Sequence, residues 1–387
     1  MALCLVYLQQ SSSVSSHRGY EAIEDIVRKK TGLDFQGITE NISPDVLADV
    51  IQLFGNAEAS QSSDFLGDSL EIVLGFLNSA GRYGQFRTPS HIAQFMARTT
   101  PISKGDVLLD PAAGTGGFLV AAVHAKKKVV FDILGDEVDQ TMVSVARANV
   151  LLSGRNPNCI RHRDALDVLD EEADVILANP PFSGRIVNRQ SYDLTSNSNK
   201  SEILFVELIM RRLKKGGVTS FIIPSGVLTN ADKASTEIRR RLVEEGQVLC
   251  VIELPRGVFR PYTDVLTAIV YWKKSGRTSR VPMFRPMSDG FTLDDRREPI
   301  EENHLHEIEE AVRHAARGTK GIKFESEITL ETLNENSLNL LPAWYQEIDN
   351  IATILPSLTD LLKEVTTQSN RVATLIKSLT KDLKNEK

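Results

Sequence analysis

The tetrapeptide Asn179-Pro180-Pro181-Phe182 has residue types that together suit the handling of a planar amine. The two prolines fix the backbone and remove two hydrogen-bond donors, so the carbonyl groups here face outward as acceptors. An asparagine oxygen and a neighbouring carbonyl can hold both hydrogens of an exocyclic amine, and a phenylalanine ring offers a face for stacking. A rigid turn would explain the prolines but not the residues that flank them. We therefore interpret these four residues as the candidate catalytic site.

A second motif, which runs from Asp110 through Gly114 to Phe118, is rich in glycine and follows an apolar segment. Glycines let the backbone turn tightly and let a ligand approach closely. Glu137, after the next apolar segment, could accept hydrogen bonds from both ribose hydroxyls. Asp164 is placed to accept from an adenine amino group. Because position 119 is Leu, the full dinucleotide fingerprint is missing, and a single adenosine-type cofactor fits better than NAD. A tight turn with no ligand is the alternative.

The elements around these motifs alternate between strands and helices. Apolar runs at residues 107–109, 133–134, 174–178 and 218–223 predict strands, and the short segment 159–161 is expected to form a further one; helices are expected from about 117 and over 139–152 and 202–213. This order predicts a doubly wound α/β sheet, whose ligands bind at the carboxyl ends of the strands. Residues 247–254 and 266–272 are joined by too few residues for a crossover helix, which predicts an antiparallel hairpin at the sheet edge.

The flanking regions have a different character. Residues 1–18 are rich in Ser and Gln, and helices are expected at 20–30, 44–54, 64–79 and 301–317. From Ile351 to Leu383 apolar residues step by four and three, with Ser369 the exception, which is typical of a coiled-coil seam. A helix packed on its own domain is the alternative to docking on a partner. We predict a helical N-terminal region at 1–83, a catalytic domain at 84–345 and a docking helix at 346–387.

Together the motifs resemble the amino-methyltransferases that use S-adenosylmethionine, and more closely the modification subunit of type I restriction–modification systems. The likeness covers roughly residues 64–345. The resemblance implies a class I S-adenosylmethionine-dependent methyltransferase sheet, N6-adenine methylation of duplex DNA, and Asn179 and Phe182 as the catalytic pair. It also implies that the cofactor is held by the segment Gln85, Phe86, Arg87, Thr88 and Pro89, by the glycine loop with Thr115, Gly116 and Gly117, and by Glu137. The family usually carries a longer N-terminal helical domain, so residues 1–83 would be a reduced version.

The family's C-terminal helices join a specificity subunit, which suits the heptads. The resemblance thus implies double-stranded DNA and a specificity subunit as partners, with a restriction subunit and a second copy of the chain as further ones. Nothing in the sequence resembles a target-recognition domain or a nuclease site. The polar stretch 183–201 is nineteen residues long, which is more than a connection without a function needs in a compact domain. We interpret them as a loop that orders over DNA or an extruded base, with a dispensable surface insertion as the alternative.

Composition narrows the remaining possibilities. The 387 residues carry a net charge of −6, so binding of nucleic acid by bulk positive charge is not expected. The basic clusters at 211–215 and 239–241 are interpreted as solvated helix faces. The cysteines and histidines show no metal-ligand spacing, and no bound metal is expected. The apolar start has no basic region before it and no apolar run is long enough to span a membrane, which predicts a cytoplasmic protein.

Two rivals remain at this point. The same four-residue motif serves methylation of RNA adenines and of protein glutamine side chains, so the substrate could differ while the enzyme class stays the same. Alternatively, the chain could be a cofactor-binding assembly subunit without turnover. The segments around the motif and the heptads favour the DNA methyltransferase over both.

Overall fold

The computed structural model describes residues 25, 27–29, 88–168, 170–182, 184–187, 189–319, 324 and 326–346. The chain divides into two compact units, residues 1–342 and 343–387, and the description below concerns the first. Asp25 and the segment 27–29 are helical, within the helix expected at 20–30. The helices expected at 44–54 and 64–79, the site residues Gln85, Phe86 and Arg87, and the heptads at 351–383 lie outside the described residues.

A nine-stranded sheet forms the centre of the fold, in the order β11-β8-β6-β7-β5-β4-β1-β2-β3. The five strands β3, β2, β1, β4 and β5 run parallel, whereas β7 is antiparallel to both β5 and β6. The predicted α/β sheet is confirmed. The strand bounds are β1 Val107–Asp110, β2 Asp132–Glu137, β3 Ile160–His162, β4 Ala173–Ala178, β5 Leu213–Pro224, β6 Gln247–Glu253, β7 Thr267–Lys273, β8 Arg280–Phe284 and β11 Glu327–Thr329.

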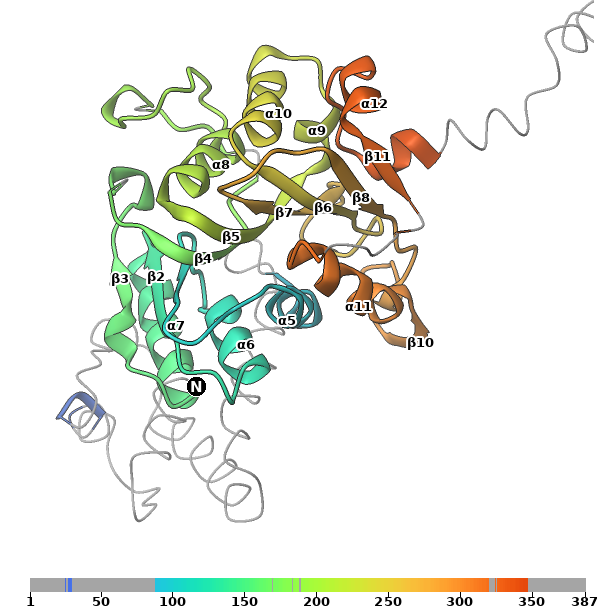
Figure 1. Ribbon diagram of the computed structural model, residues 1–387. Coiled ribbons are helices and arrows are strands. Elements are labelled where there is room, and N and C mark those ends of the chain that lie inside the picture. Colours follow the sequence, from blue (N-terminus) through green and yellow to red (C-terminus); the bar gives the residue numbers. More distant parts are fainter. Residues whose placement is uncertain are drawn as a thin grey trace, which may run out of the picture. The chain divides into compact units, whose positions relative to one another are not determined.

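Helices cover both faces of this sheet (Figure 1). One layer holds α5 (Ser90–Thr99), α6 (Gly117–Ala125), α7 (Gln140–Leu152) and α11 (His304–Ala316). The opposite layer holds α8 (Ser201–Arg212), α9 (Ser225–Thr229) and α10 (Lys233–Glu244). A further helix, α12 (Leu330–Glu335), follows β11. Helices on both faces are the arrangement expected when parallel strands are joined by crossover helices.

The hairpin of β6 and β7 is antiparallel as predicted, but its expected place at the sheet edge is wrong. β6 pairs in parallel with β8, and β8 pairs with β11, so the sheet continues beyond the hairpin. These added strands lie on either side of residues 301–317, the one helix that the sequence predicted in this part of the chain. A separate pair, β9 (Asp289–Phe291) and β10 (Pro299–Asn303), also lies there. Within the part of the chain that the structure describes, no helix is long and apolar enough to cross a bilayer.

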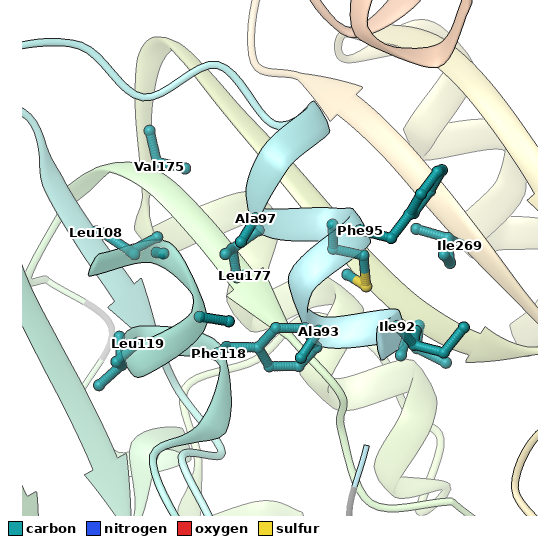
Figure 2. Close-up of a cluster of buried hydrophobic side chains, with 14 of the residues drawn as sticks. Ile92, Ala93, Phe95, Ala97, Leu108, Phe118, Leu119, Val175, Leu177 and Ile269 are labelled. Carbon is teal, nitrogen blue, oxygen red and sulfur yellow. The ribbon is translucent and has the colours of Figure 1, made fainter. Parts of the chain in front are cut away.

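The main hydrophobic core lies between the sheet and the layer that contains α5 and α6 (Figure 2). Helix α5 buries Ile92, Phe95 and Met96, which repeat at the spacing of one helical face. These side chains pack with Phe118 of α6 and Ile269 of β7. This packing fixes the start of α5, where Ile92 and Ala93 donate their backbone N–H groups to the carbonyl of Pro89. The predicted site residues Thr88 and Pro89 are therefore anchored to the core.

The interpretation of the two basic clusters as solvated faces is wrong for one arginine in each. Arg212 at the end of α8 is buried and donates to the buried Asp136 at 2.6 Å. Arg239 in α10 is buried and donates to the carbonyls of Val227 and Asn230 at 2.8 and 2.9 Å. Each guanidinium is long and carries five donors, so it can reach buried acceptors that no nearby sequence position reveals.

Candidate active site

The predicted functional residues meet at one edge of the sheet. Asp110 ends β1 and Glu137 ends β2, while Asp164 lies just after β3 and Asn179 just after β4. These four strands are parallel neighbours, in the order β4-β1-β2-β3. Parallel strands present their carboxyl ends at the same edge, where open α/β sheets bind ligands. Residues far apart in the chain are thus brought together as the sequence pattern predicted.

A pocket of about 270 Å³ opens at this edge. The predicted residues that line it are Gly114, Glu137, Asp164, Asn179, Pro180, Pro181 and Phe182. Other predicted residues lie nearby without lining it. Asp110 is only 1% exposed, and Thr115, Gly116 and Gly117 lie at the start of α6. Thr88 and Pro89 precede α5 and are not among the lining residues.

The glycine loop is held in shape by Glu137. One carboxylate oxygen of Glu137 accepts from the backbone N–H of Gly114 at 2.8 Å, and the other accepts from that of Asp139 at 2.8 Å. Gly116 has a φ of 79°, in the left-handed region that favours glycine, and it precedes α6 directly. On the other side, Asn149 of α7 donates to the carbonyl of Thr115 at 3.0 Å. Both carboxylate oxygens retain lone pairs for ligand hydroxyls.

The side-chain oxygen of Asn179 is buried and has no hydrogen-bond partner among the described residues. A buried acceptor without a donor costs about 1–3 kcal/mol, so proteins rarely keep one without a use. Of the backbone carbonyl groups that follow Asn179, that of Pro181 already accepts a hydrogen bond from the hydroxyl of Ser201 at 2.8 Å. The arrangement leaves the Asn179 oxygen as an acceptor ready for a donor that enters the pocket.

Phe182 is held firmly next to Asn179. Its ring meets that of Phe259 edge to face, with centroids 6.0 Å apart and an interplanar angle of 80°. Only 7% of Phe182 is exposed, so a planar group that stacks on it has to enter the pocket. Phe259 belongs to the loop after β6 and is itself buried. Such edge-to-face pairs contribute about 0.5–1.5 kcal/mol beyond their buried area.

The two acidic residues at the end of β2 have separate roles. The side chain of Asp136 is fully buried and lies in an ion network with Arg161, Arg163 and Arg212 at 2.8, 2.8 and 2.6 Å. Glu171 joins this network, and its hydrogen bond from Arg163 lowers its pKa to about 2. The carboxylate of Asp136 is thus engaged by these arginines, which leaves Glu137 as the acid that contacts the glycine loop.

Asp110 has an unusual electrostatic environment. Burial raises the pKa of its carboxyl to about 8, and the negative charges of Glu137 and Asp136 act in the same direction, against one hydrogen bond from the N–H of Ala112. The protonated form therefore predominates in the ligand-free chain at neutral pH. A cation placed beside Asp110 would favour its ionised form.

The similarity of this chain to known proteins agrees with the geometry of the site. The model of the N-6 DNA methylase family matches residues 61–353. The chain belongs to this family. It is 32% identical over 261 residues to the methylase subunit of the type I restriction enzyme EcoEI from Escherichia coli, an alignment that covers 62% of this chain and 53% of the relative. The chain thus spans about half the length of the first curated relatives it matches.

Solved structures share the fold of this N-6 DNA methylase family member. A structure of a type I restriction–modification system superposes with a TM-score of 0.67 at 24% identity, over 99% of this chain and 82% of the other. A class I S-adenosylmethionine-dependent methyltransferase from Listeria monocytogenes gives 0.56 at 18%, over 81% and 99%. These likenesses confirm the predicted class I methyltransferase sheet.

The pocket residues that the sequence did not predict are Pro111, Ala112, Asp136, Val138, Arg163, Ala165 and Phe205, together with Phe259, which contacts Phe182. Val138 is 64% exposed and lines the pocket beside Glu137, and Phe205 of α8 lines it as well. Val138 could have been inferred from its place directly after Glu137, the predicted ribose acid. Phe205 had no signal, because nearly every residue of α8 is buried and no single stripe stands out.

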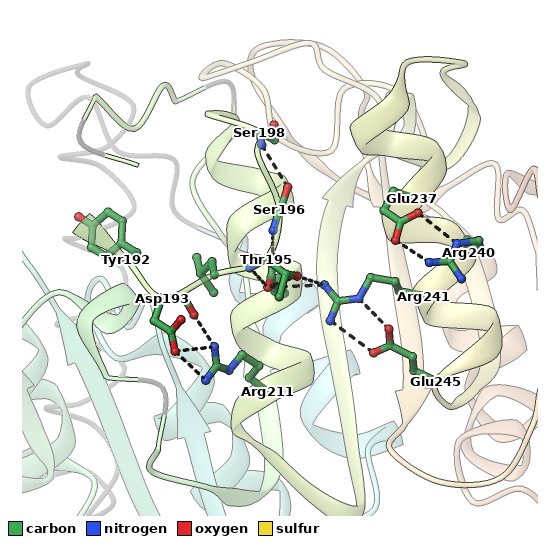
Figure 3. Close-up of polar contacts among 12 residues, drawn as sticks. Tyr192, Asp193, Thr195, Ser196, Ser198, Arg211, Glu237, Arg240, Arg241 and Glu245 are labelled. Carbon is green, nitrogen blue, oxygen red and sulfur yellow. Dashed lines mark hydrogen bonds and ion pairs between the residues drawn. The ribbon is translucent and has the colours of Figure 1, made fainter. Parts of the chain in front are cut away.

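The long segment after the Asn-Pro-Pro-Phe motif is extensively bonded to the domain (Figure 3). We call residues 184–187 and 189–200 the post-motif loop. The buried Glu207 of α8 accepts from the backbone N–H of Ser196 at 2.9 Å and from the hydroxyl of Thr195 at 2.7 Å. Leu194 packs in a small core with Leu166 and Phe205. The post-motif loop is thus bonded to and packed on the domain of this family member. Its contact with DNA stays a prediction.

Proposed function

We propose that this chain is the modification subunit of a type I restriction–modification system. It would transfer a methyl group from S-adenosylmethionine to N6 of an adenine that is flipped out of duplex DNA. The observation that carries the proposal is the buried Asn179 oxygen, which has no partner within the described part of the chain and lies in the pocket that also contains Glu137 and Asp164. Membership of the N-6 DNA methylase family supports DNA adenine as the substrate over RNA adenine or protein glutamine.

The residues of the pocket fit an adenosine-type cofactor. Glu137 offers lone pairs to ribose hydroxyls, Asp164 offers an acceptor to the adenine amino group, and Val138 adds an apolar side chain to the lining of the same pocket. Asp110 would lie near the positive charges of S-adenosylmethionine, and these charges favour the ionised form of its carboxyl group. When bound, S-adenosylmethionine supplies a methyl group on a positively charged sulfur, a good electrophile for an amine.

The chemistry that the chain supplies is mostly positioning. Asn179 and the carbonyl of Pro180 would accept the two hydrogens of the adenine amine, which favours the more nucleophilic, pyramidal nitrogen. Phe182 would stack on the base and hold it in place. Positioning and placement of charge can supply most of the rate enhancement. No strong general base is needed, because the methylated amine is acidic enough to lose its proton to water.

We infer that DNA site choice comes from a specificity subunit, which the heptads at 351–383 would contact through the specificity subunit's helical spacers. A restriction subunit and a second copy of this chain would complete the assembly. The relatives include methylase subunits of type I restriction enzymes, which supports such an assembly. The net charge of −6 agrees with phosphate contacts that lie mostly on partners.

Mapping of N6-methyladenine in cellular DNA tests this proposal. Cells expressing the chain with its candidate specificity subunit should carry methyladenine at one bipartite sequence, and cells expressing the chain alone should not. Purified chain that binds S-adenosylmethionine but yields no methyladenine under either condition would contradict the proposal. That outcome would favour an RNA or protein substrate, or an assembly role without turnover.

Replacing Glu137 with Gln should weaken binding of S-adenosylhomocysteine by about 30-fold or more. Glu137 now accepts hydrogen bonds from the backbone N–H groups of Gly114 and Asp139. The glutamine amide would turn its own N–H group toward one of these two donors, so one hydrogen bond would be lost, and a hydrogen bond to a charged group contributes about 1.5–3 kcal/mol. Titration calorimetry measures the affinity. The exposed Glu301→Gln is the matched control and should bind as the wild type does. Unchanged affinity in Glu137→Gln would exclude the assigned role.

A further inference from the structure

The post-motif loop reaches back to the pocket through one side chain. Tyr192 donates its hydroxyl hydrogen to Oδ2 of Asp164 at 2.8 Å. Asp164 lines the pocket, and Tyr192 lies 28 residues later in the chain. Since the loop follows Asn179–Phe182, this hydrogen bond joins the segment after the predicted catalytic motif to Asp164, the pocket residue that lies after β3.

The hydrogen bond fixes the orientation of the Asp164 carboxylate. Its other oxygen, Oδ1, accepts from the backbone N–H of Leu166 at 2.9 Å. With one donor on each oxygen, rotation of the carboxylate is restricted, and each oxygen keeps a further lone pair. Burial and the charge of Asp164 raise the pKa of Tyr192 to about 12, so its hydroxyl remains a neutral donor at neutral pH.

Hydrogen bonds with Arg189 of the loop, and with residues of α8 and α10, fix the backbone around Tyr192. Arg189 donates to the carbonyls of Tyr192, Leu194 and Ser196. Glu207 accepts from Thr195 and Ser196, and Arg241 donates to the hydroxyl of Thr195 at 3.1 Å (Figure 3). Because these bonds fix the backbone at and after Tyr192, its side chain starts from a fixed position and can hold the carboxylate of Asp164 in one orientation.

We propose that Tyr192 is a positioning residue for the cofactor site, which orients Asp164 as the acceptor for the exocyclic amino group of the cofactor's adenine. The inference rests on the proposed function and deepens it. It links occupancy of the adenine end of the pocket to the order of the post-motif loop, because a ligand held by Asp164 and the loop held through Tyr192 share the same carboxylate. Such coupling is reciprocal.

The test compares two ligands that differ only at the group in question. S-adenosylhomocysteine carries the adenine amino group, and its analogue with purine in place of adenine lacks it. In the full-length chain, Tyr192→Phe should raise the dissociation constant of S-adenosylhomocysteine about fivefold, the effect of one hydrogen bond, and leave that of the purine analogue unchanged. Equal weakening of both ligands, or no change in either, would overturn the inference.

Tyr271→Phe is the matched control. It removes a buried tyrosine hydroxyl that bonds to Thr99 at 2.5 Å, away from the pocket, so it should lower the melting temperature without changing the ratio of the two affinities. Asp164→Asn alone should remove the preference for the amino group, so it remains informative where Tyr192→Phe folds poorly, and a retained preference would contradict the inference. Where both variants fold, adding Tyr192→Phe to Asp164→Asn should change the ratio no further, and a further change would also contradict the inference. Failure of the wild type to bind either ligand would overturn the proposed function as well, whereas binding with an unaltered Tyr192→Phe ratio overturns this inference alone.

Discussion

Replacing Asn179 with alanine should reduce methyl transfer by about three orders of magnitude and leave the affinity for S-adenosylmethionine unchanged. The Asn179 oxygen is buried without a partner among the described residues, so it contributes an interaction only when an amine enters the pocket. Such an interaction acts on the reacting base and not on the cofactor. The structure also predicts the effect on stability. Because a buried, unsatisfied acceptor costs about 1–3 kcal/mol, its removal should leave the melting temperature unchanged or raise it.

Three measurements on one preparation separate a catalytic role of Asn179 from a structural one. They are transfer of a labelled methyl group to DNA in the presence of the specificity subunit, calorimetric binding of S-adenosylmethionine, and thermal unfolding. Asn158→Ala, at an exposed position, is the matched control and should behave as the wild type in all three. Loss of cofactor binding, or a clear fall in melting temperature, would show that Asn179 supports the fold or the cofactor and not the target base.

The part of the site that could be predicted from sequence follows from local pattern and the geometry of parallel sheets. Asp110 and Glu137 end short strands, and Asp164 and Asn179 come just after two others. Because parallel strands end at a common edge, the meeting of these residues could be predicted without knowledge of side-chain contacts. The central strands could be recognised as apolar runs because helices cover both faces of the sheet, so the side chains on both sides of these strands are buried.

What could not be predicted depends on partners far away in the chain. Arg212 stands among basic residues that look solvated, but its acceptor Asp136 is 76 positions earlier. Tyr192 looked like one polar residue in a long loop, and only the folded structure places it on Asp164. The strands β8 to β11 were missed for a related reason. They are short, and β10 is largely exposed, so no alternation of apolar and polar residues marks them.

Asp110 should make the stability of the chain fall as pH rises from about 4 to about 8. The folded protein holds its proton up to a pKa of about 8, whereas the unfolded chain releases it near the ordinary value of 3.8. Between these values the folded state binds the extra proton, so the free energy of unfolding decreases by about 1.4 kcal/mol per pH unit and levels off above pH 8. The total is on the order of 5 kcal/mol.

Asp110→Asn isolates this contribution, because asparagine matches the neutral carboxyl in size and does not titrate. The variant should gain stability relative to the wild type steadily between pH 5 and pH 8, as measured by urea unfolding of the ligand-free chain. Asp132→Asn, at an exposed position on β2, controls for the loss of a carboxylate and should show no such trend. A constant difference between Asp110→Asn and the wild type across this range would mean that Asp110 is ionised in the folded protein. The positive charges of S-adenosylmethionine favour the ionised carboxylate, so its binding at pH 7 should release a proton from the wild type and none from Asp110→Asn.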